Sequence, residues 1–187
     1  MNAFILVGSA LAILTYLPLW KQIWTREVEQ NVFAYSMAVI LDVIVGISII
    51  LQNGSFLLPI TYAIGSFITV LLILRSTKPP SWTWFETLVS SLVVVCMIVW
   101  YFSGNRIATI ASSMALFFSS IPQAADAWKR PHKMPMLVFL IYSVANALCM
   151  IGGKCWSVEE RLFPASGLVM CLMMVIFSVR RFWSKQN

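Results

Sequence analysis

Residues 32–51 read VFAYSMAVILDVIVGISIIL, an apolar run in which Asp42 is the only charged residue. A run of about 20 such residues has the length that an α-helix needs to cross the hydrocarbon core of a bilayer. Lipid offers backbone N–H and C=O groups no hydrogen-bond partner, so a spanning segment of this kind must be helical. The run stops at Gln52, Asn53 and Gly54, where turn-forming residues follow. This stretch therefore predicts a transmembrane helix that carries one carboxyl group deep in the membrane.

Further apolar runs of similar length lie on both sides of this one. They cover about residues 3–22, 56–74, 84–103, 107–127, 134–152 and 162–179. Of the 187 residues, 60% are hydrophobic and only 11% are charged, whereas a soluble domain carries about 25% charged residues. We therefore expect an all-α integral membrane protein with seven transmembrane helices.

Two stretches near the ends of the first and fifth runs are related to each other. Residues 16–26 read YLPLWKQIWTR, and residues 120–130 read SIPQAADAWKR. In each stretch Pro is followed by Trp six residues later and by Arg two residues after that, and the two copies are 104 residues apart. The same or a nearly equal offset relates other residues at matching places in their helices, namely Asp42 and Asn146, Pro59 and Pro164, and Arg75 and Arg180. Matches at nearly one offset indicate an internal repeat.

The repeat predicts the order of the helices. Residues 1–78 would form a first three-helix repeat and residues 106–187 a second. A linker helix would lie within residues 79–105, because the run at 84–103 has no counterpart. A single linker helix leaves both repeats in the same orientation, so we expect two parallel repeats in a 3+1+3 arrangement. Parallel repeats are a known plan among transporters, whose binding site lies between the repeats near the bilayer midplane.

Lys and Arg residues are distributed unequally between the two predicted sides of the membrane. The loops after the first, third and fifth runs, together with the C-terminal segment, hold ten of the 13. The opposite side holds three, which are Arg106, Lys154 and Arg161. Because positively charged loops tend to stay in the cytoplasm, this distribution predicts a cytoplasmic C-terminus and an N-terminus outside.

The pattern around the two prolines resembles a PQ-loop repeat. The first copy has Leu17-Pro18 followed by Gln22, Asn31, Tyr35 and Asp42, and the second has Ile121-Pro122-Gln123 followed by Trp128 and Asn146. The second copy keeps the Pro-Gln dipeptide, whereas the first has Pro18-Leu19. Over nearly its full length the chain is similar to the seven-helix form of the SWEET/PQ-loop superfamily.

The resemblance implies a small-solute transporter that works by alternating access, with a sugar, an amino acid or a similar polar metabolite as its substrate. In that superfamily the prolines of the first and fifth helices act as hinges, which here are Pro18 and Pro122 with Gln123 beside it. The acid in the second helix of a repeat often couples transport to protons, and Asp42 occupies that place. Members of the superfamily often associate, so a homo-oligomer is compatible with the resemblance. Passive facilitation stays open, and so does a non-transporting receptor or scaffold, because one fold serves several functions.

Polar residues inside the second and sixth runs are the first candidates for a binding site. A charge at the membrane centre costs about 2.5–3.5 kcal/mol on insertion scales, so Asp42 should face a cavity or a partner. Its carboxyl would then bind and release a proton, or serve as a neutral structural group bonded to a neighbouring helix. Asn146 and Tyr142 are four residues apart and share a helix face, where they would contact a solute or join helices.

A further group of candidates lies in the third run. Tyr62, Ser66 and Thr69 recur at helical spacing and form a polar stripe, which would line a solute pathway or bond back to its own helix. The prolines have two interpretations as well. Pro18 and Pro122 each remove one backbone donor, so they would act as hinges or as static kinks. Gln123 would satisfy the carbonyl that Pro122 frees, or face headgroup water.

Several classes of function are not expected. The chain has no His-Glu-x-x-His, Gly-x-Ser-x-Gly or Walker-type motif, so we do not predict an enzyme. A membrane enzyme would depend on Glu159, Glu160 and Asp126, which are predicted to lie on opposite sides. His132 is the only histidine, so neither a metal site nor a cofactor is expected. The net charge of +6 follows from basic helix ends and does not indicate nucleic-acid binding. The expected partners are the lipid bilayer, a small polar solute and, if transport is coupled, protons.

Overall fold

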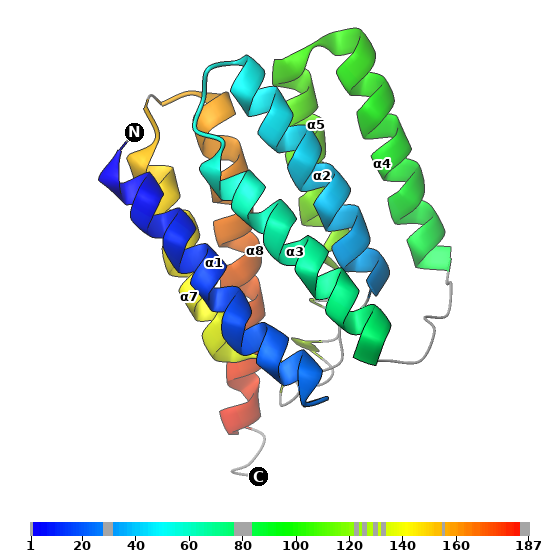
Figure 1. Cartoon of the computed structure of the whole chain (residues 1–187), viewed down its shortest axis with the longest axis vertical. Helices are drawn as coiled ribbons and strands as arrows, with labels where there is room; N and C mark the ends of the chain where they lie inside the picture. The colour runs from blue at the N-terminus through cyan, green and yellow to red at the C-terminus, as the bar shows by residue number, and fades with distance from the viewer. Residues whose placement is uncertain are drawn as a thin grey trace.

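The computed structural model describes residues 2–27, 32–76, 84–121, 124, 127–128, 131, 134–154 and 156–183. Within this part of the chain it contains seven helices and no strand (Figure 1). The helices are α1 (Ala3–Trp24), α2 (Val32–Leu51), α3 (Leu57–Ser76), α4 (Trp84–Ser103), α5 (Asn105–Ser119), α7 (Met136–Gly152) and α8 (Val158–Trp183). The prediction of an all-α protein is confirmed.

Four of the described helices are long and apolar enough to cross a membrane. They are α1, α2, the Leu57–Arg75 part of α3 and the Glu160–Val179 part of α8. α7 and the Ser90–Ser103 part of α4 are apolar but shorter. α5 has 15 residues, which rise about 22 Å along the helix axis, against a hydrocarbon core of about 30 Å. The helices are therefore compatible with a multi-pass membrane protein, and the crossing of the membrane by all seven stays a prediction.

The outer surface of the bundle is apolar. Among its larger side chains, Leu14, Ile64, Leu74, Leu137 and Ile176 are each more than half exposed. Contiguous exposed apolar surface is unfavourable in water and marks a membrane or protein contact. A lipid environment removes this cost, which agrees with the apolar helices.

Six of the helices form a closed ring. Going round it, α1 packs against α3, α3 against α2, α2 against α5, α5 against α8, α8 against α7, and α7 against α1. We call α1, α2 and α3 the first triplet, and α5, α7 and α8 the second triplet. In each triplet the third helix lies between the first and the second. α4 lies outside the ring and packs against α5 and α2 (Figure 1).

The two ends of the bundle hold different parts of the chain. The N-terminus and the turns that join α2 to α3, α4 to α5 and α7 to α8 lie at one end, the upper one in Figure 1, which we call the N-terminal end. α2, α4 and α7 begin at the opposite, C-terminal end, where α8 finishes. α1 therefore begins at the end of the bundle opposite to the one where α8 finishes, and the side of the membrane that each end faces stays a prediction.

Polar contacts join the two triplets at the N-terminal end. The backbone N–H of Ser55, just before α3, donates to the Glu160 carboxylate of α8 over 3.0 Å. In the neighbouring turns, Lys154 Nζ donates to the backbone carbonyl of Asn53 over 2.8 Å. Both contacts connect the turn between α2 and α3 with the segment that leads into α8. They therefore hold the first and second triplets together at this end.

The predicted hinge residues lie in different parts of the chain. α1 continues as an α-helix through Pro18, which lies on an exposed side of that helix. α5 ends at Ser119. Pro122 and Gln123 lie outside the described residues, so the hinge prediction for this pair stays a prediction.

Candidate functional site

A cavity of about 150 Å³ lies inside the ring of helices. Its described lining comes from α1, α2, α3, α5, α7 and α8, with none from α4. The polar members are Tyr16, Tyr35, Asp42, Tyr62, Ser66, Ser119, Ser120, Tyr142, Asn146 and Ser166. The other members are Ala34, Ala38, Leu116, Phe117, Phe139, Phe163, Gly167, Met170 and Cys171. Both triplets thus contribute to one cavity that is lined by polar and aromatic side chains.

One face of α2 supplies the acidic wall of the cavity. Tyr35, Ala38 and Asp42 are spaced three and four residues apart, so they lie on the same side of the helix and all line the cavity. Asp42 is 4% exposed. Among the described residues its carboxyl group has neither a hydrogen bond nor an ion pair. A buried carboxylate without a partner is costly, so this position favours either the neutral form or a positively charged ligand.

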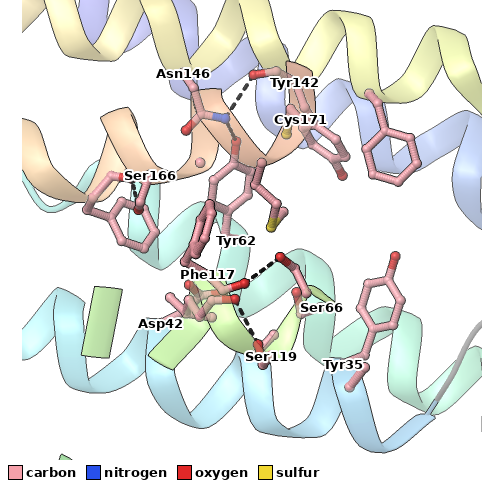
Figure 2. Close-up of a pocket in the computed structure, with 18 of the residues that line it drawn as sticks. Tyr35, Asp42, Tyr62, Ser66, Phe117, Ser119, Tyr142, Asn146, Ser166 and Cys171 are labelled. Carbon is pink, nitrogen blue, oxygen red and sulfur yellow. Dashed lines mark hydrogen bonds between the residues drawn. The ribbon is translucent and has the colours of Figure 1, made fainter. Parts of the chain in front are cut away.

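Asn146 of α7 supplies the opposite wall, as Figure 2 shows. Its Nδ2 donates to the hydroxyl of Tyr62 over 2.6 Å and to the backbone carbonyl of Tyr142 over 2.8 Å. A methyl group at Gly167 of α8 would overlap its Oδ1, so this glycine leaves the space that the amide fills. Oδ1 itself is buried and has no partner among the described residues.

Three tyrosines from different helices form an aromatic cluster beside these two groups. The ring of Tyr142 lies edge-to-face with those of Tyr16 and Tyr62, at centroid distances of 5.5 and 5.6 Å. The hydroxyl of Tyr16 lies 3.1 Å from Ser66 Oγ and donates to the backbone carbonyl of Tyr62 over 3.3 Å. α3 has Gly65 where any side chain would overlap the Tyr16 ring. The buried hydroxyl of Tyr142 interacts with that of Tyr16.

The structure divides the polar stripe predicted on α3. Tyr62 and Ser66 line the cavity, whereas Thr69 does not. Thr69 is completely buried, and its hydroxyl donates to the backbone carbonyl of Gly65 over 2.8 Å. It also accepts a hydrogen bond of 2.9 Å from Trp20 Nε1 of α1. Thr69 therefore joins α3 to α1 next to the cavity.

The cavity brings together five of the six predicted binding residues: Asp42, Asn146, Tyr142, Tyr62 and Ser66. Sequence reasoning did not place Tyr16, Tyr35 or the α5 serines, Ser119 and Ser120, in the site. For Tyr35 a signal existed, because it precedes Asp42 by seven residues, which is two helical turns. Within the described residues, no three His, Cys, Asp or Glu side chains lie close enough together to hold a metal ion.

The cavity lies in the middle part of the bundle. On α2, which begins at the C-terminal end, its lining residues run from Ala34 to Asp42, in the half nearer that end (Figure 1). On α8, which begins at the N-terminal end, they run from Phe163 to Cys171, in the half nearer that end. No family model, curated protein or solved structure matches the chain. Its function is therefore inferred from the cavity itself.

Proposed function

We propose that this protein is a small-solute membrane transporter that works by alternating access, with its solute bound in the central cavity. One observation carries the proposal: the cavity holds the carboxyl of Asp42, which has no hydrogen bond or ion pair among the described residues, together with hydroxyl groups from both triplets. Buried polar groups in proteins are normally hydrogen-bonded. A solute that enters the cavity would supply the missing partner.

The proposal includes two parallel three-helix repeats in a 3+1+3 arrangement with α4 as the linker, as in the SWEET/PQ-loop superfamily. The order of neighbours supports it. In each triplet the third helix lies between the other two. Between the triplets, α1 packs against α7 and α2 packs against α5. An approximate two-fold axis through the ring would produce this pattern. The cavity would then lie between the repeats, which is the usual place for a transporter site.

Alternating access would expose the cavity first at one end of the bundle and then at the other. The distribution of Lys and Arg predicts that the C-terminal end is cytoplasmic. Opening at the N-terminal end would require the bonds of Ser55 with Glu160 and of Asn53 with Lys154 to break. These contacts are the part of the described structure that a change of state must rearrange.

Asp42 would be the proton-linked or substrate-orienting group, and the test separates these roles. The protein is reconstituted in liposomes, and uptake of sugars, amino acids, amines and nucleosides is followed with and without an inward proton gradient. Gradient-dependent uptake of one class that is lost in Asp42→Asn supports a proton-coupled carrier. Gradient-independent uptake assigns facilitated transport and leaves Asp42 a binding role. Absence of flux for every solute, with folded and inserted protein, contradicts the transporter and favours a receptor.

A further inference from the structure

The cavity carries an unbalanced charge. Asp42 is its acidic residue, and none of its described lining residues is Lys, Arg or His. The other groups that can titrate there are the phenols of Tyr16, Tyr35, Tyr62 and Tyr142, with the thiol of Cys171 on α8. These groups are neutral at physiological pH, so they do not compensate the carboxylate. An anionic solute would meet an uncompensated negative charge, whereas a cation would neutralise it.

Several hydroxyl groups of the cavity offer a ligand only their lone pairs. Three lining hydroxyls donate to carbonyls of their own helical segments: Ser119 to Leu116, Ser120 to Phe117 and Ser166 to Phe163, over 2.8, 2.6 and 2.8 Å. Each of these hydroxyls keeps its oxygen lone pairs for a ligand but has already used its proton.

The amide nitrogen of Asn146 has also used its protons. Nδ2 donates to the Tyr62 hydroxyl and to the Tyr142 carbonyl, which are the two bonds that a primary amide can donate. A solute carboxylate would find tyrosine hydroxyls but no cationic side chain in the described lining, and a neutral sugar would leave the Asp42 carboxylate unpaired. An ammonium group, which only donates, fits the carboxylate and the acceptors beside it.

Aromatic rings enclose the same space. The four tyrosines line it together with Phe117, Phe139 and Phe163. Cations bind favourably over the faces of aromatic rings, most strongly where water is excluded. The volume of about 150 Å³ is close to that of an apolar protein cavity, of about 150 Å³, that accommodates benzene. The rings and the volume suit a compact organic group attached to the ammonium.

We infer that the solute bound in this cavity is a small protonated organic amine, in preference to a sugar, an amino acid or an organic anion. This inference rests on the proposed function only in taking the cavity as the solute site. The ammonium group would lie against Asp42, and its organic part would contact the tyrosine rings. A quaternary ammonium compound keeps the charge but has no N–H donor, so it should bind more weakly.

Binding to the purified protein tests the inference without transport. The probes share one ring size and differ in their polar group: cyclohexylamine, cyclohexanol, cyclohexanecarboxylate and the trimethylated ammonium derivative of cyclohexylamine. Isothermal titration in detergent should show cyclohexylamine binding at least about tenfold more tightly than each of the others. Equal or tighter binding of the alcohol or the carboxylate would overturn the inference.

Two substitutions locate the effect. Asp42→Asn should reduce the preference for cyclohexylamine over cyclohexanol to about twofold or less, whereas Glu160→Gln, at a buried acid outside the cavity lining, should keep it. Asp42→Ser removes the same charge with a smaller polar side chain, so it should reduce the preference in the same way. This second variant keeps the test decisive if Asp42→Asn does not fold. An unchanged amine preference in either folded variant would contradict the inference.

The results also separate this inference from the transport proposal. Amine binding without flux in liposomes would retain the ligand class and contradict transport. Flux of a sugar or an amino acid without amine binding would retain transport and contradict the ligand class.

Discussion

α2 and α7 occupy matching places in the two triplets, yet their polar residues have opposite environments. Asp42 and Asn146 are separated by the offset of the internal repeat, and they lie on opposite walls of the cavity (Figure 2). Among the described residues Asp42 has no hydrogen bond, whereas the amide nitrogen of Asn146 makes two. Gly167 makes room for Asn146. Asn146 is thus built into the fold, and Asp42 is available to a ligand or a proton.

Exchanging the two side chains should have the largest effect. The double variant Asp42→Asn with Asn146→Asp keeps one carboxyl and one amide in the cavity. A carboxylate at position 146 cannot donate to the Tyr142 carbonyl, and an amide at position 42 carries no charge. We expect solute uptake in liposomes to fall by at least about 100-fold, which is more than either single substitution should cause. Recovery of uptake by the exchange would show that the two positions are equivalent.

Neutralising only the acid should have the next largest effect. Asp42→Asn should lower uptake by at least about tenfold, because it removes the charge while it preserves the shape of the side chain. The protein should remain folded, since the carboxyl has no bond in the described structure to lose. Glu160→Gln is the matched control, because a glutamine oxygen can still accept from the Ser55 N–H. Equal loss of uptake in both variants would contradict a specific role for Asp42 in transport.

The packing of Asn146 can be tested through its neighbour. Gly167→Ala places a methyl group where Asn146 Oδ1 lies, and overpacking of this kind costs about 1–3 kcal/mol in the free energy of unfolding. Unfolding by SDS titration measures this loss. Adding Asn146→Ala should recover part of it, so the two changes should be non-additive. Additive losses would show that the two residues do not compete for one space.

The smallest effect is expected next to the cavity at Thr69. Thr69→Val keeps the shape but removes the partner of Trp20 Nε1, and hydrogen bonds between membrane helices contribute about 0.6 kcal/mol on average. The free energy of unfolding should fall by about this amount, and the apparent affinity for solute should change by less than about twofold. The contrasting variant is Ser66→Ala, which alters the cavity wall. A larger effect on affinity at Thr69 than at Ser66 would contradict the division of the stripe.

Much of the helical structure could be predicted from hydrophobicity. The expected runs at 32–51 and 84–103 coincide with α2 and α4. The run at 162–179 ends up inside a longer helix, because α8 begins at Val158 and includes Glu160 and Arg161, which a search for apolar residues leaves out. Hydrophobicity marks the part of a helix that lies in lipid, and the backbone can continue the helix beyond it.

The candidate site was predictable where a polar residue interrupts an apolar helix. Asp42 and Asn146 stand out for this reason. Tyr16 was missed, because a helix that is apolar all round gives no sign of which side faces the centre. For Thr69 the sequence left two roles open, and its hydroxyl takes the second by donating back to Gly65 of its own helix. The sequence did not predict that the same hydroxyl accepts from Trp20 of α1. Such a contact between distant segments has no signature in the spacing of one helix.

The position of α4 outside the ring has a consequence for any relative motion of the triplets. The triplets meet along two seams, one between α1 and α7 and the other between α2 and α5, and α4 packs across only the second. A movement that separates α2 from α5 must also detach α4 from one of them, whereas the seam between α1 and α7 carries no such cover. If the triplets rock, the pivot should therefore lie along the covered seam and the larger displacement at the other. α4 would in this way make the two seams open unequally.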